Sequence, residues 1–313
     1  MINIYKQIFK EIEKNDKIII TTHLRADGDC VGSAIGLKEI IKSMYKDKSV
    51  KVSFENMKFL SFLGSPDKIE EDEFKNALII SVDNASLKRS NDPRITLSNK
   101  IIKIDHHPNK EPFGYINLVD ENRCACAEII FDFLSNIKNP SISVDGLEAL
   151  CTGILTDSGR LSYSHVDSRT FMTIGKMIDM GIDYQKIVNH LDETSKEELR
   201  FKGYVLSNFE ETENGVLYIK ITKEMRDKYN VSYDEASNMV SELSGVKKSP
   251  IWALFNEAHE NEIRCRVRSN GIKINETCEK FGGGGHENAS GIVVDSFEKC
   301  DEILNALDEL LKK

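Results

Sequence analysis

Short runs rich in isoleucine and valine alternate with helical patterns along the first half of the chain. Continuously apolar runs of this length are typical of strands buried on both faces of a parallel sheet, and their alternation with helices indicates an α/β fold. The predicted strands are 17–22, 50–54, 77–82 and 100–104, and the predicted helices are 31–44, 124–134, 144–156 and 168–180. We therefore expect an N-terminal domain with a mostly parallel sheet and helices on both faces.

The second half of the chain has a different pattern. The strands predicted there are 216–221, 250–257 and 262–269, and an amphipathic helix is predicted over 296–311. The polar segment before them reads as a helical connector over 186–208, or alternatively as one more surface helix of the first domain. We expect a first domain over residues 1–185 and a smaller α/β domain over 209–313.

The chain is acidic, with a formal net charge of −9 over 313 residues. Proteins that bind a long nucleic acid duplex usually carry more basic than acidic residues. This acidic chain is better suited to a small anionic substrate that binds in a locally basic pocket. No basic segment followed by an apolar stretch stands at the N-terminus, and no apolar run approaches the roughly 20 residues of a membrane helix. The seven cysteines contain no Cys-x-x-Cys pair, so we expect reduced thiols in a cytoplasmic protein.

Acidic and imidazole side chains follow three of the predicted strands. Ligands bind at the carboxyl ends of the strands in an open parallel sheet, so these side chains are expected to meet at one edge. A further aspartate follows the apolar helical pattern of 144–156. The residues are His23, Asp27 and Asp29 after the first strand, Asp83 after the third, Asp105, His106 and His107 after the fourth, and Asp157.

So many carboxylates packed together repel one another unless a cation compensates their charge. Divalent metals are the usual solution, and a mixed imidazole–carboxylate set suits manganese, iron, cobalt or zinc better than calcium. Each aspartate alone would be read as a helix cap or a turn residue, and Asp29 and Asp157 fit that description. The recurrence of acid-bearing segments favours a metal site.

A glycine run in the second domain suggests an anion site. Four consecutive glycines, 282–285, precede His286, and such a run either turns its amides toward an anion or forms a flexible turn. In the strand 262–269 the arginines fall at every second residue and share one face, which is either an anion-binding face or a solvated sheet surface. Six Lys or Arg against three Glu between 247 and 273 make this region locally basic.

The order and spacing of His23-x-x-x-Asp27-x-Asp29, Asp83, Asp105-His106-His107 and Asp157 resemble the DHH phosphoesterase family. The glycine run with its histidine resembles the C-terminal domain that accompanies DHH domains in oligonucleotide-processing members. One departure is Ala26, where the family often has proline, and this position is not a ligand.

The resemblance implies two manganese ions, although other divalent metals would also serve. It assigns one ion to His23 and Asp27, and assigns Asp83 to a bridge between the two ions. The second ion is assigned to Asp29, His106 and Asp157. His107 would lie at the rim near the phosphate, and Asp105 would orient an imidazole.

The same resemblance assigns substrate contacts to the second domain. Its phosphate and sugar ligands would be Arg266, Arg268, Ser269, Gly283, Gly284, Gly285 and His286.

The activity implied is hydrolysis of short oligoribonucleotides to nucleoside 5′-monophosphates, together with removal of the 3′-phosphate of 3′-phosphoadenosine 5′-phosphate. The alternative is a phosphodiesterase for cyclic di-AMP or linear pApA, which shares the two-domain layout. Inorganic pyrophosphatases lack the glycine loop in their second domain, and a non-catalytic metal-binding regulator would have lost a ligand. We expect short single strands or small nucleotides as partners, without duplex nucleic acid or membrane, and a homodimer would be unsurprising.

Overall fold

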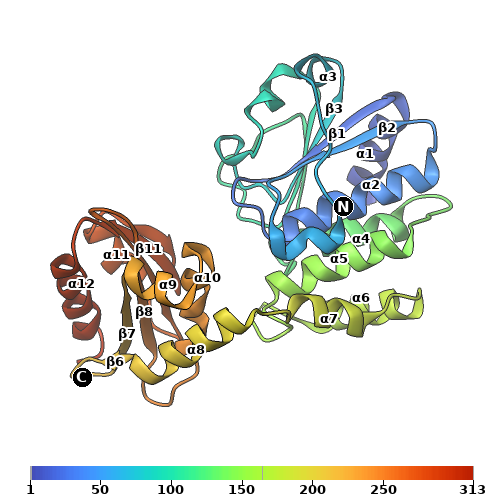
Figure 1. The fold of residues 1–313 in the computed structure, drawn as a ribbon. Coiled ribbons are helices and arrows are strands. Elements are labelled where there is room, and N and C mark those ends of the chain that lie inside the picture. Colours follow the sequence, from blue (N-terminus) through green and yellow to red (C-terminus); the bar gives the residue numbers. More distant parts are fainter. Residues whose placement is uncertain (1, 164, 313) are drawn as a thin grey trace. The chain divides into compact units, whose positions relative to one another are not determined.

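The computed structural model describes residues 2–163 and 165–312. Its contacts divide the chain into two compact units, Met1–Asp192 and Glu193–Lys313, whose helices and strands are drawn in Figure 1. Each unit has its own hydrophobic core. The boundary lies inside the segment for which we predicted a connector. Helix α7 (Tyr184–Leu191) contributes Ile187 to the core of the first unit, and helix α8 (Lys196–Asn208) contributes Phe201 to a core of the second.

A parallel sheet with the strand order β2-β1-β3-β4-β5 forms the centre of the first unit. Its strands are β1 (Lys17–Thr21), β2 (Ser49–Ser53), β3 (Leu78–Val82), β4 (Ile101–Asp105) and β5 (Ile116–Val119). The register places Thr21 beside Ser81 and Val82 beside Ile104, so β1, β3 and β4 end at the same edge. The prediction of an α/β fold is confirmed. The short edge strand β5 was not predicted.

Helices cover both faces of this sheet. The larger core lies between one face and the helices α1 (Ile2–Lys14), α2 (Gly28–Met44) and α4 (Cys126–Asn136). On the opposite face, α3 (Glu71–Lys75) and the 3-10 helix η3 (Pro93–Leu97) bury Phe74 and Ile95 against Ile19 and Ile79. Short 3-10 helices also form at η1 (Lys58–Leu63) and η2 (Leu87–Arg89), and α6 (Ser168–Asp179) follows α5 (Val144–Asp157).

Helix α5 packs closely along α2, and Figure 1 shows the two side by side in blue and green. Glycines at every fourth position of α2 line the contact, at Gly28, Gly32 and Gly36. A Cβ on Gly32 would overlap the backbone carbonyl oxygen of Ala149, and one on Gly28 would overlap the side chain of Thr156. The absence of these side chains therefore sets how closely the C-terminal end of α5 approaches the N-terminal end of α2.

We predict that Gly32→Ala lowers the free energy of unfolding by about 1–3 kcal/mol, because the new methyl group meets backbone and α5 must move away. The matched control is Gly175→Ala in the middle of α6, where a Cβ meets nothing within 4 Å. That change should instead stabilise the protein by roughly 0.5–1 kcal/mol, since alanine is the better helix former. Denaturant unfolding followed by circular dichroism measures both, and equal stabilities would contradict the close-packing argument.

The second unit is built on a mixed sheet with the strand order β10-β11-β9-β8-β7-β6. Its strands are β6 (Glu210–Glu211), β7 (Val216–Ile221), β8 (Ile251–His259), β9 (Glu262–Ser269), β10 (Gly284–His286) and β11 (Ala289–Val294). One face packs on α11 (Asn275–Lys280) and α12 (Phe297–Glu309). Part of the other face is covered by α8, α9 (Lys223–Tyr229), α10 (Tyr233–Asn238) and η4 (Met239–Leu243). The prediction of a smaller second α/β domain is thus confirmed.

Within residues 2–163 and 165–312, no helix is both long enough and apolar enough to cross a membrane. The seven cysteines, which we predicted to be reduced thiols, are all free, and all are buried.

Candidate active site

The candidate ligands from the first unit gather where β1, β3 and β4 end. Three groups have donor atoms that all lie within 4.8 Å of one another in each group. They are His23, Asp27, Cys30 and Asp83; Asp29, His106 and Asp157; and Asp83, His106 and His107. Asp83 and His106 each belong to two groups, so the donors form one continuous cluster.

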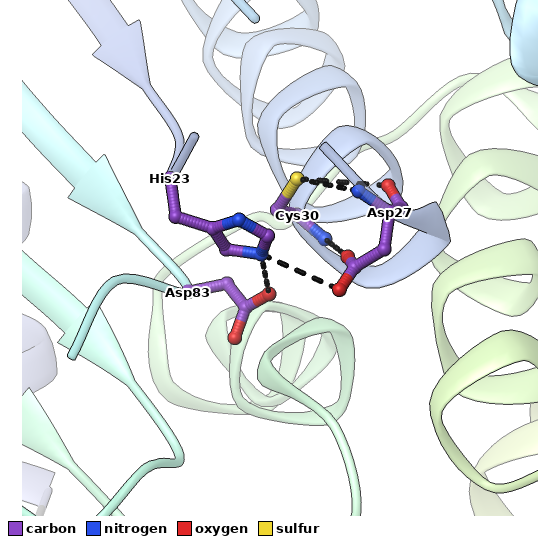
Figure 2. Close-up of side chains that lie close together, drawn as sticks. All are labelled: His23, Asp27, Cys30 and Asp83. Atoms are coloured by element: carbon purple, nitrogen blue, oxygen red, sulfur yellow. Dashed lines mark hydrogen bonds and ion pairs between the residues drawn. The ribbon is translucent and has the colours of Figure 1, made fainter. Parts of the chain in front are cut away.

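The imidazole of His23 is held in one orientation by the backbone. Its Nδ1 lies 2.8 Å from the carbonyl oxygen of Leu24, to which it donates. The other nitrogen, Nε2, is then left 3.4 Å from one oxygen of Asp27 and 3.4 Å from one oxygen of Asp83 (Figure 2). Metal-ligating histidines commonly show this arrangement, in which the outer ring nitrogen donates to a carbonyl and the inner one faces the cation.

The backbone directs the two aspartates of this group into the site. Asp27 is the N-cap of α2, where one carboxylate oxygen accepts a hydrogen bond from the amide of Cys30 at 3.0 Å and the other faces His23. Asp83 directly follows β3 and adopts a left-handed conformation with φ of 50°. Non-glycine residues rarely hold this conformation, and such strain gathers at functional sites.

In the second group, the backbone orients the imidazole of His106 in the same way as that of His23. Its Nδ1 lies 3.2 Å from the carbonyl oxygen of Arg123. Its Nε2 lies 3.3 Å from Asp157 Oδ2, 3.4 Å from Asp83 Oδ1 and 3.8 Å from Asp29 Oδ2. One imidazole nitrogen therefore faces three carboxylates, which is an arrangement suited to a shared cation.

Asp29 is fully buried and joins the site to the fold. Its oxygens accept hydrogen bonds from the amides of Cys126 at 2.6 Å and Ala127 at 2.9 Å, at the start of α4. We had considered Asp29 and Asp157 as helix caps. In the structure the cap of α2 is Asp27, Asp29 lies in the first turn, and Asp157 is the last residue of α5.

The position of Asp157 is electrostatically unfavourable without a cation. The carbonyl end of a helix carries partial negative charge, so it repels a carboxylate. Burial raises the pKa of Asp157 to about 7, and the charge of Asp83 adds to this despite the opposing effect of His106. Burial, followed by the charges of Asp83 and Asp157, likewise raises the pKa of Asp29 well above its ordinary value.

The imidazoles of the cluster retain protons for the same reason. Burial alone would disfavour the charged form of His106, but its contacts with Asp83 and Asp29 outweigh burial and raise the pKa to about 10. In His107, contacts with Asp105 and Asp83 similarly outweigh burial and raise the pKa to about 9. Protons thus supply the positive charge that these carboxylates require.

Behind His107 lies a buried pair of opposite charges. Asp105 accepts hydrogen bonds through Oδ1 from His107 Nδ1 at 2.9 Å and from the amide of His106 at 2.9 Å. Its Oδ2 lies 3.1 Å from the Nζ of Lys103, a lysine with no exposed surface. Lys103 also donates to the carbonyl oxygen of Ala85 at 3.1 Å, so it ties β4 to the segment that follows β3.

The donor set fits divalent cations. Asp83 Oδ1 is buried and forms no hydrogen bond, although the ring nitrogens of His106 and His107 each lie 3.4 Å from it, and such a buried carboxylate oxygen is costly. In His23 and His106, Nδ1 bonds to a backbone carbonyl oxygen, so Nε2 is the ring nitrogen that faces the carboxylates. His23, Asp27 and Asp83 would hold one cation, and Asp29, His106 and Asp157, with Asp83 shared, would hold another.

We predict that the chelated protein loses stability as the pH rises from 6.5 to 10. The folded pKa values of His106 and His107 lie above 6.5, so their contribution is complete below that pH and is lost as the pH rises through about 9 and about 10. The pKa of Asp157 is raised from 3.8 to about 7, so its contribution is lost at the lower end of this range, as the pH rises through about 7. Metal affinity should increase over the same range, since cations replace the protons of His106 and Asp157, which are among their proposed ligands.

Thermal unfolding in a chelator across this pH range measures the effect, and the variant His106→Asn should show a shallower dependence. A chelated protein that gains stability toward alkaline pH relative to this variant would contradict the assignment of protons to the imidazoles.

The arginines of β9 lie on one face of the sheet of the second unit, alternating with buried Ile263, Cys265 and Val267. Arg264 is engaged locally, with Nε 2.8 Å from Glu262 and the guanidinium 5.9 Å from the ring of Tyr233. Arg266 and Arg268 stand beside Gly291 and Ala289 of β11. Arg268 donates to the carbonyl oxygen of Val267 at 2.9 Å, and Arg266 to Asn238 Oδ1 at 3.3 Å.

Part of the glycine run, for which we predicted either an anion-binding segment or a flexible turn, forms a β-strand. Gly284, Gly285 and His286 form the edge strand β10, which pairs with β11. A Cβ on Gly283 would overlap the carbonyl oxygen of Gly291, so close packing requires glycine there. His286 is exposed. Ser269, in contrast, donates its hydroxyl to the carbonyl oxygen of Ile272 at 2.5 Å and is buried.

Sequence reasoning missed three features of the first unit. Cys30 lies among the ligands of the first group, Lys103 supports Asp105, and the glycines of α2 allow α5 to approach. The spacing of Gly28, Gly32 and Gly36 is visible in the sequence as a small-residue stripe. Lysine in a predicted buried strand is an equally visible anomaly, because lysine is rarely buried without a partner.

Comparison with known proteins covers nearly the whole chain. Residues 17–154 match the model of the DHH family, N-terminal domain, and residues 213–313 match the DHHA1 domain. A protein of Streptococcus mutans named probable bifunctional oligoribonuclease and PAP phosphatase NrnA is 34% identical over 98% of this chain and 99% of its own length. The bifunctional oligoribonuclease and PAP phosphatase NrnA of Bacillus subtilis is 31% identical over 98% of both chains.

Among solved structures, an exopolyphosphatase-related protein from Bacteroides fragilis superimposes with a TM-score of 0.87 at 27% identity. The match covers 99% of this chain and 95% of that one, so the similarity extends over both units.

Proposed function

Because the chain belongs to the DHH phosphoesterase family, we propose that it is a manganese-dependent phosphodiesterase that hydrolyses short oligoribonucleotides to nucleoside 5′-monophosphates. We further propose that it removes the 3′-phosphate of 3′-phosphoadenosine 5′-phosphate. The relatives named for these two activities match the chain from end to end at 31% and 34% identity. The observation that carries the proposal is the cluster of carboxylates and imidazoles at the ends of β1, β3 and β4.

Two divalent cations bound in this cluster would polarise the phosphate and lower the pKa of an attacking water. Manganese is the proposed ion because the donors are oxygens and imidazole nitrogens. The buried carboxylates hold the required negative charge in a fixed arrangement, since α2, α4 and the strand ends position them before any ligand binds.

His107 is proposed to contact the substrate. It is partly exposed, and its pKa of about 9 keeps the ring protonated at neutral pH, so it can donate a hydrogen bond to a phosphate oxygen. Asp105 holds the ring through Nδ1 and is proposed as a positioning residue. In the second unit, Arg266, Arg268, His286 and the glycines of β10 are proposed to bind a second phosphate or sugar, with Ser269 supporting the turn beside them.

We predict that Asp83→Asn reduces hydrolysis by at least about 100-fold, because the shared carboxylate charge is lost from the site. The fold should persist, since the amide has nearly the same shape. Asp47→Asn makes the same charge change at an exposed position and serves as the control. Turnover of a short RNA in manganese, with circular dichroism of each variant, measures the effect; near-normal turnover by a folded Asp83→Asn protein would rule out the shared-carboxylate model.

We predict that Arg268→Ala weakens the use of a dinucleotide by roughly 10- to 100-fold, since a charge-assisted hydrogen bond contributes about 1.5–3 kcal/mol. Arg264→Ala is the matched control, because Arg264 lies on the same face, forms an ion pair with Glu262 and is not among the residues proposed to bind substrate. A model phosphodiester without a second nucleotide should be affected much less. If Arg268→Ala impairs both substrates equally, the residue supports the fold and not recognition.

The third test concerns substrate length. A local basic face inside an acidic chain engages only one or two phosphates, so affinity should fall gently with salt, with a log–log slope of roughly −1. Turnover should be highest on dinucleotides to about pentanucleotides and should decrease toward strands of about 24 nucleotides. A length series of labelled RNA, with cyclic di-AMP, linear pApA and 3′-phosphoadenosine 5′-phosphate alongside, measures this. Steep salt dependence with efficient digestion of the longest strand would overturn the small-substrate proposal.

A further inference from the structure

A thiol lies among the carboxylates and the imidazole of the first ligand group. Cys30 has no exposed surface, and its sulfur lies within 4.8 Å of donor atoms from His23, Asp27 and Asp83. Figure 2 shows the side chains of His23, Asp83 and Asp27 around the first turn of α2, with the sulfur of Cys30 beside the backbone of Asp27. One nitrogen, two carboxylates and one sulfur are enough donors for a tetrahedral metal ion.

We propose that Cys30 makes this metal position a site for thiophilic divalent cations, of which zinc and cadmium are examples, bound through the sulfur together with His23, Asp27 and Asp83. Manganese would use the oxygen and nitrogen donors alone. The inference rests on the metal cluster of the proposed function but goes beyond it, because it gives the two metal positions different ligand chemistry.

The local backbone holds the sulfur in place. Cys30 is the third residue of α2, so its side chain lies at the amide end of the helix together with the other donors of the group. The amide of Asp27 points at the sulfur at 3.3 Å, while the sulfur lies 3.5 Å from the carbonyl oxygen of the same residue. When a cation binds, the thiol proton leaves to solvent and the sulfur–metal bond takes its place.

A second observation supports a cation at this position. Nε2 of His23 lies 3.4 Å from Asp83 Oδ2 and 3.4 Å from Asp27 Oδ2. The same Asp83 carboxylate directs Oδ1 toward His106 and His107, so each of its oxygens serves a different donor group. Two carboxylates that converge on one imidazole nitrogen, in a group with a thiol, are suited to a ligand that brings positive charge.

A second cysteine near the cluster, Cys126, has a different environment. The sulfur of Cys126 lies 3.4 Å from the carbonyl oxygen of Ile104, and this residue belongs to none of the donor groups found among the described residues. Soft thiolate ligands select zinc over manganese, whereas carboxylates and imidazoles accept both. The two metal positions of this chain therefore differ, since the group of Asp29, His106 and Asp157 contains no sulfur.

The test is a cobalt(II) titration of the full chain without substrate. Wild type should show the visible bands of bound cobalt together with a near-ultraviolet charge-transfer band from thiolate to cobalt. Cys30→Ser, which retains a polar partner for the amide of Asp27, should keep the visible bands and lose the charge-transfer band. Cys151→Ala is the control, because Cys151 is buried in α5 outside every donor group found among the described residues.

Cadmium affinity, measured by competition with a chelator, should fall roughly 10- to 100-fold in Cys30→Ser and in Cys30→Ala, whereas manganese affinity should change little. Visible bands without a charge-transfer band in wild type, or a charge-transfer band that survives in both Cys30 variants, would overturn the inference and leave the metal cluster intact. If wild type binds no cobalt at all, the cluster itself fails as a metal site, and the proposed function fails with it.

Discussion

The close contact between α2 and α5 is the constraint on which the site of the first unit depends. Asp29 lies in the first turn of α2 and Asp157 is the last residue of α5, so the two carboxylates come near His106 only if the helices nearly touch. The glycines of α2 make that approach sterically possible. The glycines themselves bury little hydrophobic surface in this contact. The close approach of α2 and α5 instead brings together charged groups that would otherwise remain apart.

Placing these carboxylates close together is electrostatically unfavourable. The surrounding residues reduce the repulsion between them but do not abolish it. Backbone amides at the start of α4 solvate Asp29, and protonated imidazoles face Asp83. The carbonyl groups of Leu24 and Arg123 fix His23 and His106 in orientations that face the carboxylates. The rigid parts of the fold therefore hold the donors in place before a ligand arrives, which is the arrangement expected of an electrostatically preorganised site.

The sequence allowed prediction of the fold where the local signals were strong. The strands of the parallel sheet have nearly continuous apolar runs, and the ends of β1, β3 and β4 could be inferred from them, which is why the candidate ligands were found. Strand β5 has four residues and is only partly buried, so it left a weak pattern. The pairing of α2 with α5 and the contact of Lys103 with Asp105 depend on tertiary structure, which no local periodicity encodes.

The different environments of Asp27 and Asp29 bear on how such a protein can evolve. The side chain of Asp27 is half exposed and its structural role is that of a helix cap, which asparagine or serine can also fill. Asp29 is buried and anchors the start of α4. A lineage that abandoned catalysis would thus be free to lose Asp27 first while selection for folding alone retained Asp29. The survival of a buried aspartate in a distant homologue is therefore weak evidence of activity, and the partly exposed one is the more informative position.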